Sequence, residues 1–324
     1  MNTRLIVANT AARIRLAPTD SRHVDHTSAP KTQRLLRVGH LWRHGVCASL
    51  VGMLLLASGT LSAATTLQST ELSPGLYMIS GNGGNVAFYA NGAQSLLIDA
   101  QFAATAPQLQ TELNRLANSH KIGTLVNTHF HKDHVDGNAI MGQGATIIAH
   151  PNTSKRLRAD DKFNRAGLPT KTVASRETLT FGQLAVELQA MPASHTDTDV
   201  VVRFNQVNVV HMGDLFFADR FPFIDLNSGG SVAGYIANVK QVLASIDEKT
   251  KIIPGHGPLM DKAGLTRFLQ MLEQTHAEVQ QMQAQGMNVD AAVAKGLSSQ
   301  WQSWSWNFIN EERWIRTLYG QNAK

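Results

Sequence analysis

The stretch Thr128-His129-Phe130-His131-Lys132-Asp133-His134 places three histidines and one aspartate within six residues. It directly follows an apolar run over residues 122–127 that predicts a β-strand. Residues two apart in an extended segment project to the same side, so the imidazoles of His129 and His131 can share one cation. Asp133 and His134 fall where a second cation could bind. Imidazole and carboxylate ligands suit zinc, with iron or manganese as alternatives.

Residues 1–63 have the order of features of a secretory signal peptide, preceded by a long polar N-terminal extension. Four basic residues between positions 31 and 43 precede an apolar run over residues 45–56, and the small residues Ser62-Ala63-Ala64 follow. We therefore expect cleavage near residue 63 and a secreted or periplasmic mature protein. An uncleaved anchor is the alternative. The apolar run is short for a membrane span, however, and no other long apolar run follows, so we expect no stable membrane insertion after leader removal.

Removal of this leader changes the charge of the chain. The full chain has 29 Lys+Arg and 24 Asp+Glu, of which residues 1–63 hold 8 and 2, so 21 basic and 22 acidic residues remain. The mature part has no basic tract, which argues against nucleic-acid binding. The single cysteine, Cys47, also lies in the leader, so the mature part forms no disulfide and offers no thiolate to a metal.

Short apolar runs alternate with amphipathic stretches along the mature chain. Strands are expected in two groups, over residues 75–80, 85–89, 95–99, 122–127 and 145–149, and over residues 184–190, 200–204, 207–212 and 251–253. Helices are expected over residues 106–118, 152–160, 231–245 and 265–285. Two sheets with helices outside them predict an α/β fold with four αββα layers, in a single domain over residues 64–324 that ends in C-terminal helices.

Three more candidate metal ligands each follow a predicted strand. They are His195 in Ser194-His195-Thr196, Asp214 in Met212-Gly213-Asp214 and His256 in Pro254-Gly255-His256-Gly257. Taken alone, each could be an ordinary turn residue. Asp99 ends the predicted strand over residues 95–99.

These residues form an ordered pattern of HxHxDH, then an isolated His, then Gly-Asp, then Pro-Gly-His-Gly. With this pattern the chain resembles the metallo-β-lactamase-fold hydrolase superfamily over about residues 77–268. The resemblance implies the four-layer αββα sandwich of that superfamily and two zinc ions. It implies that Asp214 bridges or caps the pair of zinc ions. It also implies that Asp99 and His211 orient the ligands without binding a metal themselves. The implied ligands are His129, His131 and His195 for the first metal, and Asp133, His134 and His256 for the second.

Two cations held in this way would supply hydroxide at neutral pH and polarise a carbonyl group. The expected reaction is the opening of a cyclic amide or ester in a small-molecule substrate. Asp133 would orient the water or pass a proton to the leaving group. A chain without a G-x-S-x-G motif or a mature cysteine is not expected to use a covalent mechanism.

The substrate class rests on departures from the superfamily patterns. The chain is nearest in ligand order to secreted class B β-lactamases, but Asp214 stands at the place of their cysteine ligand. Phe217 matches their lysine that binds the drug's carboxylate, and Arg220 is the candidate substitute. β-Lactam hydrolysis, and with it antibiotic resistance, is the leading expectation. A lactonase or glyoxalase II-like thioesterase is the alternative, and a di-iron redox or accessory protein is the alternative of another class.

Overall fold

The structure is a computed structural model that describes residues 66–92, 94–117 and 121–320, all within one compact unit of the chain. The predicted leader over residues 1–63 lies outside the described residues, so the signal peptide stays a prediction. In the described ranges, no helix combines the length and the apolar character that a membrane span requires.

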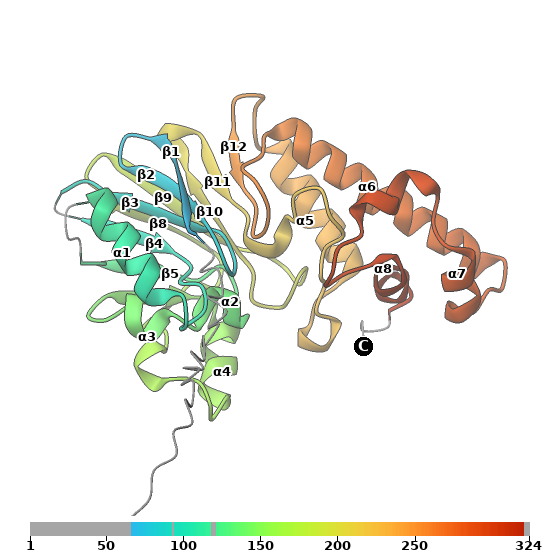
Figure 1. Cartoon of the computed structure of the whole chain (residues 1–324), viewed down its shortest axis with the longest axis horizontal. Coiled ribbons are helices and arrows are strands. Elements are labelled where there is room, and N and C mark those ends of the chain that lie inside the picture. The colour runs from blue at the N-terminus through green and yellow to red at the C-terminus, as the bar shows by residue number, and fades with distance from the viewer. Residues whose placement is uncertain (1–65, 93, 118–120, 321–324) are drawn as a thin grey trace, which may run out of the picture. The chain divides into compact units, whose positions relative to one another are not determined.

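Two sheets form the centre of the fold (Figure 1). The first is antiparallel from β1 to β4 and parallel from β4 to β7. Its order is β1 (Gln68–Ser73), β2 (Leu76–Ser80), β3 (Val86–Ala90), β4 (Ser95–Ile98), β5 (Thr124–Val126), β6 (Thr146–Ala149) and β7 (Lys171–Thr172). The second sheet is antiparallel except for the β11–β12 pair. Its order is β12 (Lys251–Ile253), β11 (Val209–His211), β10 (Val200–Phe204), β9 (Leu184–Ala190) and β8 (Arg176–Phe181).

Helices cover the outer faces of both sheets (Figure 1). Helices α1 and α3 pack on the first sheet, and α5 and α6 pack on the second. The helices are α1 (Ala106–Ala117), α2 (Lys132–Val135), α3 (Asn138–Met141), α4 (Pro151–Ala159), α5 (Val232–Ala244), α6 (Lys262–Ala284), α7 (Val289–Lys295) and α8 (Glu311–Leu318). Short 3-10 turns lie at Arg165–Gly167, Asn205–Val207, Gly213–Leu215, Leu226–Ser228 and Ser299–Trp304.

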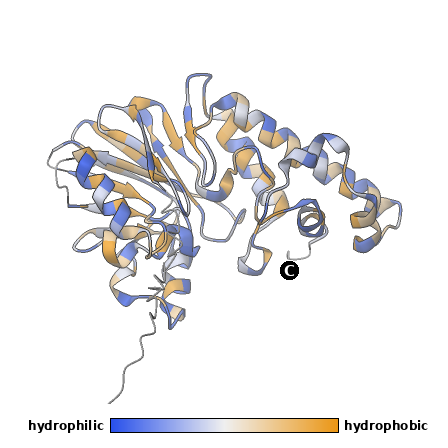
Figure 2. Cartoon of the chain, in the orientation of Figure 1, coloured by the Kyte–Doolittle hydropathy of each residue, from blue (hydrophilic) through white to orange (hydrophobic). Residues whose placement is uncertain are grey.

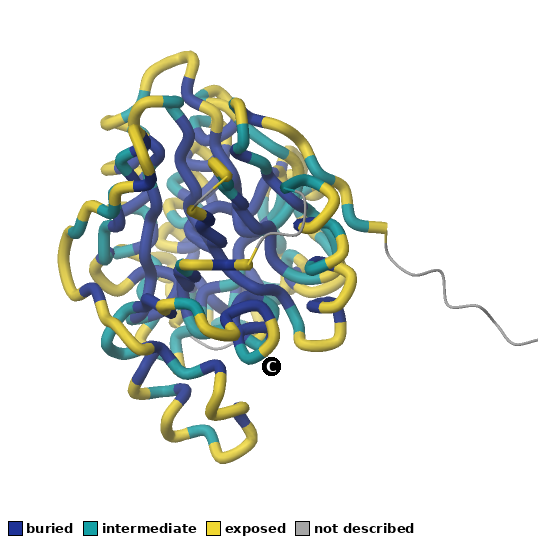
Figure 3. Tube along the Cα trace, turned by 90° about the vertical axis from the view of Figure 1, so that its left-hand side faces the viewer, coloured by how far each residue is buried: buried dark blue, intermediate teal, exposed yellow. Residues whose placement is uncertain are grey.

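Alternation along the strands explains why helices cover both sheets. In β4, Leu96 and Ile98 point between the sheets, whereas Leu97 packs against α1. In β10, Val201 faces α5 and α6 while its neighbours Val200 and Val202 face the first sheet. Because adjacent residues of a strand point to opposite faces, such uninterrupted apolar runs must be covered on both sides. Figure 2 shows apolar residues along the central strands, and Figure 3 shows buried trace at the centre of the molecule. The predicted four-layer αββα fold is confirmed.

The structure contains edge strands and C-terminal helices whose bounds the sequence pattern did not give. β1 and β8 lie at sheet edges and carry alternating polar residues, so their apolar signal is weak. β11 is shorter than predicted because Asn205–Val207 forms a 3-10 turn and Asn208 has a left-handed φ of 53°. α6 begins three residues earlier than predicted because the side chain of Asp261 accepts a hydrogen bond from the Gly264 amide and caps the helix.

Truncation of Leu97 tests the packing between the first sheet and α1. Leu97 is fully buried, so Leu97→Ala removes apolar contacts and leaves a cavity. We expect the free energy of unfolding to fall by about 2–5 kcal/mol. Urea denaturation followed by circular dichroism measures this loss. Ile140→Ala on α3 is the control, because Ile140 is 43% exposed and its truncation should change the stability little. Equal stability of Leu97→Ala and wild type would contradict this layer assignment.

Candidate metal centre

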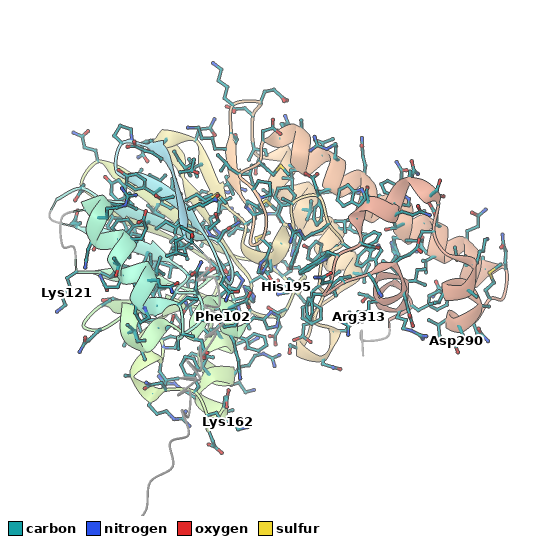
Figure 4. All side chains as sticks on the ribbon, in the orientation of Figure 1. Phe102, Lys121, Lys162, His195, Asp290 and Arg313 are labelled. Atoms are coloured by element: carbon teal, nitrogen blue, oxygen red, sulfur yellow. The ribbon has the colours of Figure 1, made fainter. Side chains whose placement is uncertain are left out.

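The residues predicted as metal ligands meet at one edge of the two sheets. His129 and His131 follow β5, and α2 adds Asp133 and His134. From the second sheet, His195 lies between β9 and β10, Asp214 follows β11, and His256 follows β12. Figure 4 labels His195 near the middle of the view. Segments far apart in the sequence converge here because the carboxyl ends of β5, β11 and β12 lie at this edge.

The first group consists of His129, His131, His195 and Asp214, whose possible ligand atoms lie within 4.8 Å of one another. His195 Nε2 lies 2.9 Å from His131 Nδ1 and 3.5 Å from Asp214 Oδ2. Asp214 Oδ2 also lies 3.7 Å from His129 Nε2. Three imidazole nitrogens and one carboxylate oxygen therefore face a common point, as a cation site requires.

The second group consists of Asp133, His134 and His256, also within 4.8 Å of one another. His256 Nε2 lies 3.2 Å from Asp133 Oδ2. The other oxygen of Asp214, Oδ1, lies 3.1 Å from His134 Nε2 and 3.5 Å from His256 Nε2. Asp214 thus directs one oxygen to each group, which is the geometry of a carboxylate shared by two cations.

Buried atoms in both groups have unmet bonding capacity. His129 Nε2, His134 Nε2 and Asp214 Oδ1 are buried and have no hydrogen-bond partner. The 3.1 Å contact between His134 Nε2 and Asp214 Oδ1 lacks hydrogen-bond geometry. Buried polar atoms left unpaired are costly, and a cation in each group would satisfy them. The donor set of imidazole and carboxylate fits zinc and also fits iron or manganese.

The carboxylate of Asp99 contacts two parts of the centre, Thr128 and His134. Its buried carboxylate accepts hydrogen bonds from the amide of Thr128 at 2.8 Å and from the hydroxyl of Thr128 at 2.7 Å. Its Oδ2 also lies 2.7 Å from His134 Nδ1, which leaves His134 Nε2 facing the second group. Asp99 has a φ of 65°, a left-handed conformation that is uncommon outside glycine. The strand therefore ends in a turn that places this carboxylate between the histidine cluster and the sheet.

His211 contacts backbone groups rather than a ligand side chain. Its Nδ1 accepts a hydrogen bond from the Gly213 amide at 3.1 Å, and its Nε2 lies 3.1 Å from the carbonyl oxygen of Asn85. Burial lowers the pKa of His211 to about 4, so the imidazole is neutral and can donate and accept at the same time. His211 thus fixes the turn that presents Asp214.

The loop after residue 222 supplies partners that the sequence pattern did not mark. Asp225 Oδ2 lies 3.1 Å from His131 Nε2, and the carbonyl oxygen of Phe223 lies 2.8 Å from His195 Nδ1. Burial raises the pKa of Asp225, but its hydrogen bonds to His131 and Ser228 and its electrostatic interactions with His131 and His195 together outweigh this effect, and the pKa falls to about 2. These acceptors fix which nitrogen of each histidine faces the first group. No motif surrounds Asp225 that would have identified it.

Two glycines lie so close to ligand side chains that a Cβ atom at either position would overlap a ligand. A Cβ atom on Gly255 would lie 2.0 Å from Asp214 Oδ1, and one on Gly84 would lie 2.2 Å from His134 Cε1. Backbone bonds hold both segments in place, because the amide of Gly84 donates to the Asp133 carbonyl at 3.1 Å and the amide of Asn85 donates to the Gly255 carbonyl at 2.7 Å. Any larger residue at these positions would displace a ligand.

The two groups differ in charge. Burial lowers the pKa of His129 and holds this imidazole neutral. Burial also opposes protonation of His134 and His256, but the Asp214 and Asp133 carboxylates outweigh it, raising the pKa of His134 well above its usual value and that of His256 to about 9. These histidines in turn hold the pKa of Asp214 well below its usual range despite burial. Protons on the second group thus compete with a cation.

A cavity of about 490 Å³ opens onto the centre. Phe217 lines it and stacks on His256 with ring centroids 5.1 Å apart. Phe216 and Phe221, from the same phenylalanine-rich segment, are buried with Phe217 in the core beneath α5 and α6 but do not line the cavity. The lining residues are Gly81, Gly83, Phe102, His131, Asp133, Asp214, Phe217, Phe223, His256, Trp306 and Phe308.

Arg220 is not among the residues that line this cavity. Its guanidinium carbon lies 5.1 Å from the centroid of the Trp306 ring, and its Nε donates to the Ala218 carbonyl at 3.3 Å. The expectation that Arg220 replaces the missing lysine is therefore not met in this structure. None of the lining residues is a lysine or an arginine, and the guanidinium groups of Arg220 and Arg313 lie against the rings of Trp306 and Phe308.

Comparison with known proteins adds two matches in sequence. Residues 94–222 match the model of the Beta-lactamase superfamily domain. A curated relative, named hydroxyacylglutathione hydrolase, from Polaromonas sp. (strain JS666 / ATCC BAA-500) is 29% identical over 140 residues, which cover 42% of this chain. The match covers 49% of that relative, so this chain aligns with about half of its length.

Solved structures share the fold at low identity. A metallo-β-lactamase from Pontibacter korlensis aligns with a TM-score of 0.55 and 20% identity, over 64% of this chain and 99% of its own. A double mutant of the sec-alkyl sulfatase PisA1 aligns with a TM-score of 0.64 and 14% identity, over 78% of this chain and 50% of its own. With the two sheets, these likenesses show that the chain has the metallo-β-lactamase fold, and residues 94–222 are similar to the beta-lactamase superfamily domain.

Proposed function

We propose that this chain is a dinuclear zinc hydrolase that opens a cyclic amide or ester in a small molecule. One observation carries the proposal, namely that Asp214 directs one carboxylate oxygen to each of two groups of imidazole and carboxylate ligands. His129, His131 and His195 would hold one cation, and Asp133, His134 and His256 the other. The match to a hydroxyacylglutathione hydrolase over part of the chain supports hydrolysis as the reaction class.

When bound, such cations lower the pKa of water and polarise a carbonyl group. The residues of the chain position these events. Asp133 lines the cavity and its side chain is 23% exposed, so it can orient a water molecule and take up its proton. Asp99 and Asp225 keep His134 and His131 in the tautomers that leave one nitrogen free for a metal.

The substrate within this class is a β-lactam, a lactone or a thioester. β-Lactam hydrolysis is the first candidate from the ligand order, and the relative's name favours a thioester as the second. The absence of lysine and arginine from the cavity lining favours a substrate whose bound part is uncharged. The proposed location is the periplasm or the exterior, reached through the predicted leader. Iron in the centre would instead favour the redox alternative.

Metal removal tests the reaction class. Purified protein should contain two zinc ions per chain and hydrolyse at least one member of a panel of β-lactams, lactones and thioesters. A chelator should abolish this hydrolysis and added zinc should restore it, because no protein nucleophile replaces the metals. Elemental analysis and absorbance assays measure both properties. Full hydrolysis by zinc-free protein, or an iron content with a visible absorption band, would contradict the proposal.

Asp214→Asn tests the shared carboxylate. An amide keeps the shape of the side chain but removes the charge that offsets two cations, so zinc binding should fall below two per chain and kcat/KM should fall by more than about 100-fold. Asp219→Asn is the matched control, because Asp219 is an exposed aspartate that pairs with Arg267. Zinc content and kinetics equal to wild type in Asp214→Asn would remove Asp214 from the ligand set.

The charge of the second group makes zinc binding depend on pH. The pKa of His256 is raised to about 9, so this imidazole is protonated at pH 7.5 and must lose its proton to bind a metal. Zinc binding to the metal-free protein should release on the order of one proton per chain or more at pH 7.5, and its affinity should fall as the pH falls. Calorimetry in buffers of different ionisation enthalpy measures the release. Zinc binding without proton release would contradict this charge state.

A further inference from the structure

The cavity over the centre has one wall made of aromatic side chains from outside the matched domain. This aromatic wall consists of Phe223, Trp306 and Phe308, with Phe217 beside it. The family model ends at residue 222, so all three wall residues belong to a part of the chain that it does not describe. Trp306 and Phe308 lie in the segment between Ser299–Trp304 and α8.

The wall is held rigidly. The indole of Trp306 donates to the Phe221 carbonyl at 2.9 Å, and its amide donates to the Ile309 carbonyl at 3.0 Å. Ile309 is fully buried in the core beneath α5 and α6 and anchors the turn. Arg313 donates to the Phe308 carbonyl at 2.6 Å, with its guanidinium carbon 5.8 Å from the Phe308 ring centroid. The conformational entropy of this segment is therefore already lost on folding, and ligand binding need not order it.

Ring contacts connect the wall to both groups of the centre. The Phe308 ring lies 5.3 Å from that of Phe223, which in turn lies 5.7 Å from the imidazole of His131. The Trp306 ring lies 6.2 Å from that of Phe217, which stacks on His256. A molecule whose reacting carbonyl lies between the two groups would therefore place its adjoining substituent against these rings.

Phe308 is the exposed part of the wall. Its exposure is 47%, and Phe308 and Ile140 are the two large apolar residues exposed in the described ranges. Exposed apolar surface that faces a cavity is typical of a binding site. Since the cavity lining contains no lysine or arginine, the ligand chemistry that fits the wall is an uncharged aromatic or long alkyl group.

We propose that Phe308 and Trp306 determine specificity by selecting substrates that carry an uncharged aromatic or long alkyl group next to the carbonyl that is hydrolysed. This inference rests on the proposed hydrolase function for its substrate side. The wall itself is a binding surface, so its affinity for an aromatic ligand can be measured without turnover. A substrate with a small substituent at the same carbonyl would bind more weakly but react through the same centre.

The test compares substrates that share a reacting bond and differ in one substituent. The pairs are phenylacetyl and acetyl thioesters of one thiol, α-phenyl-γ-butyrolactone and γ-butyrolactone, and benzylpenicillin and 6-aminopenicillanic acid. Zinc-loaded wild type should prefer the aromatic member of the pair that it hydrolyses. Phe308→Ala should raise KM for that member by about tenfold, with little change in kcat and little change for the small member.

Two further variants separate specificity from folding. Phe308→Leu keeps an apolar side chain and should retain most of the preference, whereas Ile140→Ala removes the other exposed large apolar residue, on α3, and should leave the preference unchanged. An equal preference for the aromatic member in wild type and Phe308→Ala would overturn the proposal, as would a wild type that prefers the small member.

A binding measurement keeps this proposal separate from the hydrolase function. Titration with 4-phenylbutyrate against butyrate, followed by calorimetry with zinc and again with chelator, should show tighter binding of the aromatic acid in wild type and loss of that difference in Phe308→Ala. Tighter binding of the aromatic acid without any hydrolysis would overturn the hydrolase function and support the aromatic wall as a binding surface. Hydrolysis without this binding difference would overturn the wall and leave the hydrolase function standing.

Discussion

The carboxylate of Asp214 is the constraint on which the rest of the centre depends. Its two oxygens lie within 3.7 Å of four imidazole nitrogens from three separate segments of the chain. A buried charge in such a position is stable only if it is matched, either by protons on His134 and His256 or by cations. The neutral His211 and the glycine at position 255 serve this requirement, since one fixes the turn of Asp214 and the other leaves room for its oxygen.

The core of the fold could be predicted from the sequence because buried strands are continuous apolar runs. Leu96-Leu97-Ile98 has to be covered on both faces, and this alone requires layers outside the sheet. The edge strands β1 and β8 could not be predicted in the same way, because one exposed face replaces half of their apolar residues with polar ones.

Four of the candidate ligands could be recognised from their local spacing, and the other three, with Asp99 and His211, from their order along the chain. Other groups that orient the ligands could not be recognised in this way. His129, His131, Asp133 and His134 lie within six residues, and the structure gathers them with His195, Asp214 and His256. Asp225 and the carbonyl of Phe223 carry no local pattern, and only the folded chain brings them to His131 and His195. The same holds for Trp306 and Phe308, which reach the cavity from the far end of the chain. Arg220 shows the converse, because proximity in sequence to Asp214 did not place it in the cavity.

The ligands come from both sheets, and this division has a mechanical consequence. His129, His131, Asp133 and His134 extend from the first sheet, and His195, Asp214 and His256 from the second. Cations bound between them would fasten the two halves at the rim of the sandwich, much as a disulfide staples two strands. The same metal–ligand bonds would then serve the reaction and hold the two sheets together. The strength of the connection between the sheets would therefore vary with the identity of the metal.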